Sequence, residues 1–298
     1  MYVYIDLGGK DLCLLRIGGP GLGNLLFPWA RGIVAARKYN AIPIWPTWPQ
    51  LKIGTYIRGE RDKRNYTNTF LANDNYCQGM KKIKCVMSLS KFGLSEDLIS
   101  DGLYGKDDVF IFSGMDNLFQ PIINDHQLVR SELEKIVNPK HFLYRAFDFS
   151  NTISVHVRLG DFSEYNKNVS GVSTNMKMPL EWYIDVINQL RRNQSIRVLL
   201  FSDGSDDELE PLLKMSNIER VSFGSAIADL LALSYSNIMI SSNSTFSMWA
   251  SYLGRMPVIR PNSLQLYSEN ECDEVVVNVG GCLPEGFINQ LLADQRIF

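Results

Sequence analysis

The second half of the chain contains the segments TISVHV (152–157), PLEWYIDVINQLRR (179–192) and IRVLLFSD (196–203). The first and third are short, continuously apolar runs, which are typical of strands buried on both faces of a parallel sheet. The middle segment has apolar residues at helical spacing and a proline at its start, where a helix tolerates one. The order strand, helix, strand therefore predicts a β-α-β unit.

The same alternation continues on both sides of this unit. We expect further strands at 1–7, 12–17, 42–46, 109–114, 220–223, 237–243 and 256–261, and helices at 25–40, 127–137, 208–214, 226–236 and 244–254. Pro28 is expected early in the first of these helices, near its first turn, and residues 47–75 read as a long loop or insertion. Short links between alternating strands and helices predict parallel sheets covered on both faces.

The fold class predicted is α/β, with two Rossmann-like domains facing a cleft. A chain of 298 residues is long enough to divide into two domains. The pattern breaks near 138–151, so we expect a first domain at 1–145 and a second at 146–298.

The composition limits the kinds of partner that the protein can bind and the cell compartment in which it is expected. The net charge is -2, so no sequence-wide basic field indicates nucleic acid. Nowhere do about 18 apolar residues run together, so no transmembrane segment is expected. The N-terminus does not resemble a signal peptide, and the five cysteines show no Cys-x-x-Cys spacing. These features favour a cytoplasmic protein with reduced thiols.

Three segments carry candidate chemistry, and the first is RIGGPGLGNLLF (16–27). A glycine-rich turn before a helix lets a ligand approach the backbone and presents helix N-terminal amides to an anion. Gly21, Gly23 and Asn24 are the candidate binding residues. The segment matches neither Gly-x-Gly-x-x-Gly nor a nucleoside-triphosphatase loop, which argues against a dinucleotide oxidoreductase. The alternative is a tight strand-to-helix turn without a ligand.

The second segment is SVHVRLGDF (154–162). His156 and Arg158 are two residues apart on a strand, so their side chains share one face. Arg158 offers a planar fork for phosphate oxygens, and Asp161 is a carboxylate that can accept a proton from a hydroxyl. The alternative is a structural Arg–Asp pair beside a histidine with satisfied hydrogen bonds.

The third segment is IMISSNSTFSMWASYLG (238–254). Asn243, Ser244 and Thr245 stand between a strand and a helix, where hydroxyl groups and free amides can hold an anion. The alternative is plain N-capping, which requires one of these residues. Phe246 and Trp249 are expected in the core.

The motifs Gly-Leu-Gly-Asn-x-Leu-Phe, His-x-Arg-x-Gly-Asp, Phe-Ser-Asp and Ser-Asn-Ser-Thr-Phe-Ser-x-Trp occur in this order. Their order and spacing resemble the α-1,2-fucosyltransferase family, glycosyltransferase family 11. The resemblance implies a GT-B fold and transfer of fucose from GDP-fucose, with inversion, to a hydroxyl of an acceptor glycan, the 2-OH of a galactose. It also implies an acceptor-side first domain and a nucleotide-sugar-binding second domain.

The resemblance assigns a role to each candidate. Arg158 would bind the diphosphate of the sugar donor, Asp161 would act as general base, and His156 would orient the site or contact the donor. Donor contacts would also come from Gly21, Gly23, Asn24, Asp203, Asn243, Ser244 and Thr245. No metal or other cofactor is expected, because the chain contains no Asp-x-Asp motif.

Two positions depart from the pattern of the family. Leu159 stands where members often have a second arginine, and Leu25 stands where they often have glutamine. The basic stretch 51–70 either compensates for the lost charge or is a solvated loop. Acceptor contacts are expected from 162–178 and 47–75.

Other functions stay open at this stage. They are a transferase for a different nucleotide sugar and a catalytically silent nucleotide- or glycan-binding protein. The expected acceptor is an oligosaccharide or a glycolipid of a bacterial surface-glycan pathway. Peripheral contact with the inner face of the membrane is left open.

Overall fold

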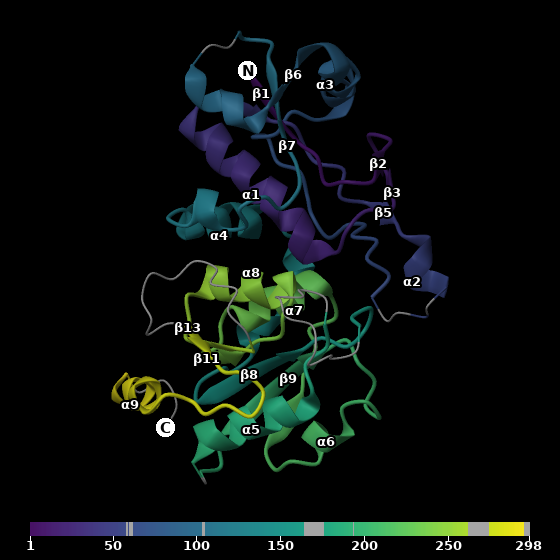
Figure 1. The fold of residues 1–298 in the computed structure, drawn as a ribbon. Coiled ribbons are helices and arrows are strands. Elements are labelled where there is room, and N and C mark those ends of the chain that lie inside the picture. The colour runs from purple at the N-terminus through teal and green to yellow at the C-terminus, as the bar shows by residue number, and fades with distance from the viewer. Residues whose placement is uncertain are drawn as a thin grey trace. The chain divides into compact units, whose positions relative to one another are not determined.

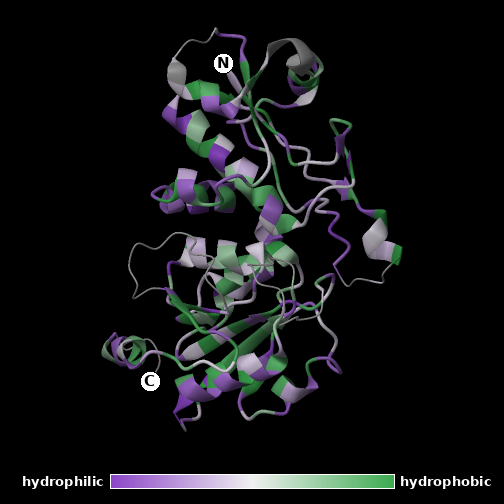
Figure 2. Cartoon of the chain, viewed as in Figure 1, coloured by the Kyte–Doolittle hydropathy of each residue, from purple (hydrophilic) through white to green (hydrophobic). Residues whose placement is uncertain are grey.

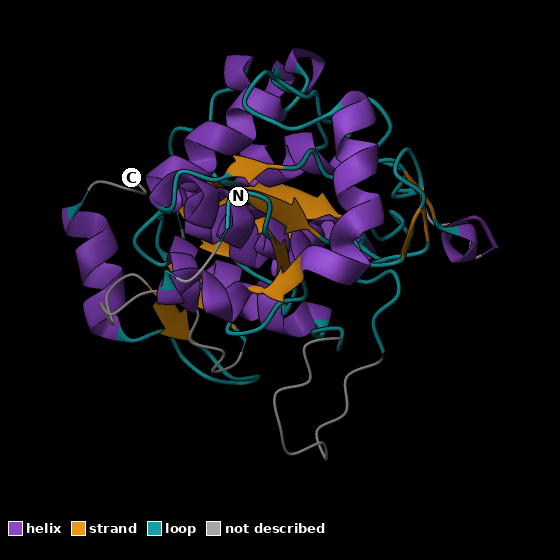
Figure 3. Ribbon diagram, turned by 90° about the horizontal axis from the view of Figure 1, so that it is seen from above, coloured by secondary structure: helices purple, strands orange, loops and turns teal. Residues whose placement is uncertain are grey.

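The computed structural model describes residues 1–57, 59, 62–102, 105–163, 176–192, 194–261 and 274–294. It divides into two compact units, Met1–His141 and Phe142–Phe298, whereas the sequence suggested a boundary after residue 145. In each unit helices pack against a parallel sheet (Figure 1, Figure 3). Within the described residues, no helix combines the length and the apolar character that crossing a bilayer requires.

The N-terminal unit is built on a four-stranded parallel sheet in the order β4-β1-β7-β6. Its strands are β1 (Tyr2–Ile5), β4 (Ile42–Pro43), β6 (Gly93–Ser95) and β7 (Val109–Phe112), and its helices include α3 (Gly79–Phe92) and α4 (His126–Ile136). Helix α1 (Leu22–Lys38) lies close against β1. Gly32 permits this approach, because a Cβ there would stand 2.8 Å from Ile5 Cγ1.

Helix α1 begins three residues earlier than the sequence suggested. Gly21 is its N-cap, and the Leu25 N–H already donates to the Gly21 carbonyl at 3.2 Å. Pro28 is therefore the seventh residue of the helix, later than its expected place near the first turn. Proline cannot donate to the carbonyl of Asn24, which costs a helical hydrogen bond. Burial of 13 of the 17 residues of α1 offsets this loss.

A second, small sheet of the N-terminal unit replaces two sequence expectations. It contains β2 (Lys10–Asp11), β3 (Arg16–Ile17) and β5 (Gln50–Leu51), and α2 (Ile53–Ile57) follows it. The single strand expected at 12–17 is wrong, because the chain turns there and Leu12 N–H donates to the Leu15 carbonyl at 2.9 Å. Residues 47–75 are likewise not one long loop.

The C-terminal unit contains a six-stranded, wholly parallel sheet in the order β10-β9-β8-β11-β12-β13. The strands are β8 (Thr152–Val157), β9 (Arg197–Ser202), β10 (Ile218–Arg220), β11 (Ile238–Ile240), β12 (Val258–Arg260) and β13 (Glu274–Val276). The predicted parallel α/β fold is thus confirmed here. The strand expected at 220–223 lies two residues earlier, because Ile218 pairs with Val198 of β9.

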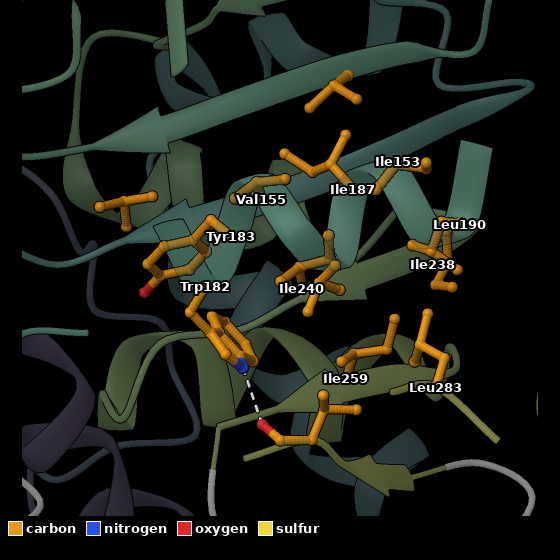
Figure 4. Close-up of a cluster of buried hydrophobic side chains, with 14 of the residues drawn as sticks. Ile153, Val155, Trp182, Tyr183, Ile187, Leu190, Ile238, Ile240, Ile259 and Leu283 are labelled. Carbon is orange, nitrogen blue, oxygen red and sulfur yellow. Dashed lines mark hydrogen bonds between the residues drawn. The ribbon is translucent and has the colours of Figure 1, made fainter. Parts of the chain in front are cut away.

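Helices cover the two faces of this sheet. The helices are α5 (Leu180–Arg191), α6 (Glu210–Leu213), α7 (Ala226–Leu233), α8 (Thr245–Gly254) and α9 (Glu285–Ala293). Side chains from α5, α6 and α9 form one apolar core with alternate residues of the central strands (Figure 4). Trp182 of α5 closes this core by donating from Nε1 to the Val277 carbonyl at 2.8 Å. The opposite face of β8 carries Ser154 and His156.

Candidate active site

The strand order of the C-terminal unit predicts where a ligand would bind. The first strand, β8, lies inside the sheet, with β9 on one side and β11 on the other. The chain runs outward from β8 through β9 to β10, then crosses to β11 on the other side of β8. Ligands of such sheets bind at the carboxyl ends of the two strands where the order reverses, here β8 and β11. The second and third sequence motifs follow β8 and β11 at these two ends.

A side-chain contact joins the two motifs directly. His156 Nδ1 and Ser242 Oγ share a hydrogen bond of 2.8 Å. The His156 ring also stacks on Phe246 of α8, with 5.0 Å between ring centroids and 23° between ring planes. Both His156 and Ser242 are buried. His156 therefore holds the end of β8 against the start of α8.

His156 is a neutral residue in the folded protein. Burial lowers the pKa of His156 from its ordinary value of 6.5 to about 3, and the nearby positive charge of Arg158 adds to this effect. The imidazole can therefore accept or donate a hydrogen bond at neutral pH but carries no charge. This state suits a residue that orients the site.

The lowered pKa makes a prediction for stability. Between pH 6.5 and 3 the unfolded chain binds a proton at His156 that the folded chain excludes. The free energy of unfolding should therefore decrease as pH falls through this window, by up to about 1.4 kcal/mol per pH unit from this residue. Urea unfolding at several pH values, compared with His156→Gln, measures it. Parallel curves for the two proteins would contradict the assignment.

Arg158 is held between two carboxylates at the end of β8. Its Nη1 lies 2.8 Å from Asp203 Oδ2, and its Nη2 donates to Asp161 Oδ1. The guanidinium carbon lies 5.4 Å from the centroid of the Phe162 ring. The side chain keeps 21% of its surface exposed, so the guanidinium is fixed in direction but still accessible.

Asp203 braces the turn that carries Arg158. Its Oδ1 accepts a hydrogen bond from the Leu159 backbone N–H at 2.9 Å, while Oδ2 pairs with Arg158. Gly160 lies against this carboxylate, and a Cβ at residue 160 would collide with Asp203 Oδ2. Both oxygens of Asp203 thus act within the protein. Its position near the nucleoside of the donor stays a prediction.

The residues after β11 are mostly engaged in local structure. Ser244 caps α8 by accepting from the Phe246 N–H at 3.3 Å. The buried Asn243 directs Nδ2 toward Met178 Sδ at 3.9 Å. Thr245 is the first residue of α8. The expected donor contacts of Asn243, Ser244 and Thr245 stay a prediction.

The two departures from the family pattern are both core residues. Leu159 is 7% exposed and packs in the core of the C-terminal unit, next to Gly204. Leu25 is fully buried in α1. Both leucines therefore pack inside the protein in this chain. The loss of a charged contact at Leu159 stays a prediction.

The remaining predicted residues belong to the N-terminal unit. Gly21 has an extended backbone, Gly23 is buried in the first turn of α1, and the Asn24 N–H donates to the Gly21 carbonyl at 3.1 Å. Arg64, from the basic stretch 51–70, approaches this turn, since its Nη1 would lie 3.8 Å from a Cβ at Gly21. Arg58 and Arg61 of the same stretch lie outside the described residues.

Sequence reasoning missed three residues of the site. Ser242, Gly160 and Phe162 each contact a residue that the sequence did single out. Residues 241–245 are five small polar residues in a row, SSNST, which gave a signal for Ser242. Gly160 could be recognised only once Asp203 was seen beside it. Residues 164–175, from the expected acceptor loop, lie outside the described residues. Among those described, no group of three or more His, Cys, Asp or Glu side chains could hold a metal ion.

Solved structures resemble the chain in fold. One is the NodZ α-1,6-fucosyltransferase soaked with GDP-fucose, which is 14% identical, with a TM-score of 0.51 over 90% of this chain and 97% of that chain. Others are POFUT1 in complex with GDP (11% identical, TM-score 0.43, 87% and 98%) and Escherichia coli heptosyltransferase WaaC (11%, 0.46, 99% and 99%). The likeness to NodZ confirms the predicted GT-B-like fold class.

The comparison with protein families gives the assignment. A search of the curated proteins finds no match. The family model described as "Glycosyl transferase family 11" matches residues 104–270, which is more than half of the chain and includes the segments after β8, β9 and β11. The family named by the sequence motifs is therefore the one that the match identifies, and the chain belongs to glycosyl transferase family 11.

Proposed function

We propose that this glycosyltransferase moves fucose from GDP-fucose to a hydroxyl group of a glycan, the 2-OH of a terminal galactose, with inversion and without a metal ion. The observation that carries the proposal is the His156–Ser242 hydrogen bond beside Arg158. It brings two family motifs together at the strand ends where ligands of such sheets bind. The fold likeness to NodZ, itself an α-1,6-fucosyltransferase, agrees with this donor.

Arg158 and the start of α8 would receive the diphosphate. Each Nη of arginine carries two hydrogens, so Arg158 can pair with Asp161 and Asp203 and still donate to phosphate oxygens. The helix N-terminus adds backbone amides and a partial positive charge. Groups fixed in this way stabilise the negative charge of departing GDP without reorganising, which is the contribution a metal ion would otherwise make.

Asp161 is the proposed general base. Its carboxylate would take the proton of the acceptor hydroxyl as that oxygen bonds to the anomeric carbon of fucose and the bond to the diphosphate breaks. Arg158 contacts Asp161, so the same guanidinium links the base to the leaving group. Asp203 and His156 would position Arg158 and the start of α8. Gly21, Gly23 and Asn24 are proposed to contribute donor contacts from the N-terminal unit.

The proposal is tested by GDP release from GDP-fucose, with EDTA present, across galactose-terminated oligosaccharide and glycolipid acceptors. We expect release that depends on the acceptor and is unchanged by EDTA, because arginine and helix amides meet the charge. Linkage analysis of the product should give an α-1,2 bond.

Two controls separate the parts of the proposal. Replacing GDP-fucose with GDP-mannose should abolish turnover if the donor sugar is recognised. Tight GDP binding without turnover of any GDP-sugar would contradict the enzymatic function and favour a silent nucleotide-binding protein. Loss of activity with EDTA, restored by a divalent ion, would contradict metal independence alone.

A further inference from the structure

The three-stranded sheet of the N-terminal unit buries its polar face and exposes its apolar face, the reverse of the usual arrangement. Its strands pair in two rows across the sheet, Lys10–Ile17–Leu51 and Asp11–Arg16–Gln50. Residues that stand directly opposite on neighbouring strands share a face, and successive residues alternate between faces. One face of the sheet therefore presents Ile17 and Leu51, and the other presents Arg16 and Gln50.

The polar row is the one that faces the interior. Arg16 and Gln50 are 1% and 2% exposed. The Arg16 Nε donates to the Thr47 carbonyl at 2.6 Å, and its Nη1 donates to the carbonyls of Leu7 and Gly8, each at 2.9 Å. Sheets with one solvated face ordinarily bury the apolar side. Here the hydrogen bonds of the polar row hold the sheet in the opposite orientation.

The apolar side chains consequently face solvent. Eight of the 19 large exposed apolar side chains among the described residues come from two eight-residue segments, 10–17 and 50–57. Leu14, in the β2–β3 turn, and Ile57, at the end of α2, are each 80% exposed. Figure 2 shows green stretches within both segments, and Figure 1 places the β2–β3 turn, β5 and α2 on the same side of the unit. We call this surface the outer face; it consists of Leu12, Leu14, Leu15, Ile17, Leu51, Ile53, Tyr56 and Ile57.

Positive charge accompanies the outer face. Lys10 stands in the same row as Ile17 and Leu51, and Lys52 stands between Leu51 and Ile53. The single acidic residue of the two segments is Asp11, which lies in the opposite row and accepts from the hydroxyls of Tyr4 and Thr47, each at 3.0 Å. The chain as a whole has a net charge of -2, so this local cationic character is a property of the surface itself.

We propose that the outer face docks the protein on an anionic lipid bilayer. Aliphatic side chains on a projecting turn and a short helix, with lysines beside them, can enter the boundary between headgroups and acyl chains while the ammonium groups meet anionic lipids. A protein interface would instead favour aromatic residues and arginine at its centre and few lysines. The proposal uses no residue of the active site and does not depend on the sugar that is transferred.

The test is flotation of the full-length protein with vesicles of phosphatidylcholine mixed with phosphatidylglycerol. We expect the wild type to float with these vesicles and less with pure phosphatidylcholine, and high salt should weaken the binding. The double variant Leu14→Gln, Ile57→Gln should lose about tenfold or more of the partition, because it removes the two most exposed anchors. Lys10→Gln with Lys52→Gln should remove the preference for anionic lipid.

The matched control is Met80→Gln with Met87→Gln on α3. These side chains are 70% and 77% exposed and lie outside the outer face, so this variant should bind vesicles like the wild type. Equal flotation of both double variants, or no flotation of the wild type, would overturn the proposal. Sedimentation velocity tests the other occupant, a second copy of the chain. If the wild type is a dimer that does not bind vesicles, and the double variant Leu14→Gln, Ile57→Gln is a monomer, the outer face is a dimer interface instead. Thermal melts verify that each variant is folded.

Discussion

Replacing Arg158 with alanine should reduce kcat by about a thousandfold while the protein stays folded. The guanidinium is accessible at the carboxyl end of β8 and is held in place by Asp161 and Asp203. We propose that it stabilises the negative charge that develops on the diphosphate as GDP leaves. An interaction that strengthens in the transition state affects kcat more than the apparent affinity for GDP-fucose. Steady-state GDP release at varied GDP-fucose gives both parameters.

The matched control for Arg158 is Arg197→Ala. Arg197 also pairs with a carboxylate on this sheet, since its Nη2 lies 2.6 Å from Glu219 Oε2, but it stands at the opposite end of β9 from the site. Its side chain is 40% exposed, so its loss should change stability and activity little. An Arg158→Ala enzyme with the activity of Arg197→Ala would remove Arg158 from the mechanism. An unfolded Arg158→Ala protein would indicate a structural role instead.

Replacing Gly160 with alanine should reduce kcat by about a hundredfold. The φ angle of Gly160 is not in the left-handed region, so alanine can adopt the backbone. The added methyl group would instead collide with Asp203 Oδ2 and displace the carboxylate that holds Arg158. The guanidinium would then lose its fixed direction toward the diphosphate. Kinetics of GDP release, together with a thermal melt, separate this loss from unfolding.

Gly286→Ala is the control for this substitution. Gly286 lies in α9, and a Cβ there would meet no atom within 4 Å. Alanine in a helix should stabilise the protein by about 0.5–1 kcal/mol and leave kcat unchanged. If Gly160→Ala retained full activity, Asp203 would not be needed to position Arg158. Asp203→Asn tests the same link from the other side, because the amide keeps an acceptor for the Leu159 N–H.

The C-terminal unit was the more predictable half of the fold. Its strands are buried on both faces, so β8 and β9 appear in the sequence as continuous apolar runs with helices between them. Short connections and right-handed crossovers then leave few arrangements other than a parallel sheet. Helix boundaries followed the prolines, as with Pro179 immediately before α5.

The small sheet could not be predicted in the same way. Residues 12–17 are apolar apart from Arg16 and resemble a strand, yet Leu12, Leu14 and Ile17 are all exposed. Periodicity shows which side chains share a face, but not whether that face is covered. The hydrogen bonds of Arg16 to distant backbone carbonyls decide the orientation, and they depend on residues that pattern reasoning does not connect.

The candidate site was predictable where contacts are local. The spacing of His156 and Arg158 predicted a shared face; His156 lies in β8, Arg158 follows this strand directly, and Asp161 is three residues further on. The contacts of Arg158 with Asp203 and of His156 with Ser242 span 45 and 86 residues, so only the folded sheet brings them together. For the same reason the sequence did not show that Leu159 packs in the core of the C-terminal unit.

Each unit of this protein is one uninterrupted segment, because the chain passes from Met1–His141 to Phe142–Phe298 once and does not return. A genetic crossover between codons 141 and 142 would thus exchange one whole unit, with its complete sheet and core, and would leave the other unit intact. Under the proposed division of labour, a recombinant could acquire a new acceptor preference in a single event and keep its nucleotide-sugar preference. Acceptor diversity among relatives could then arise by exchange of gene segments as well as by point mutation.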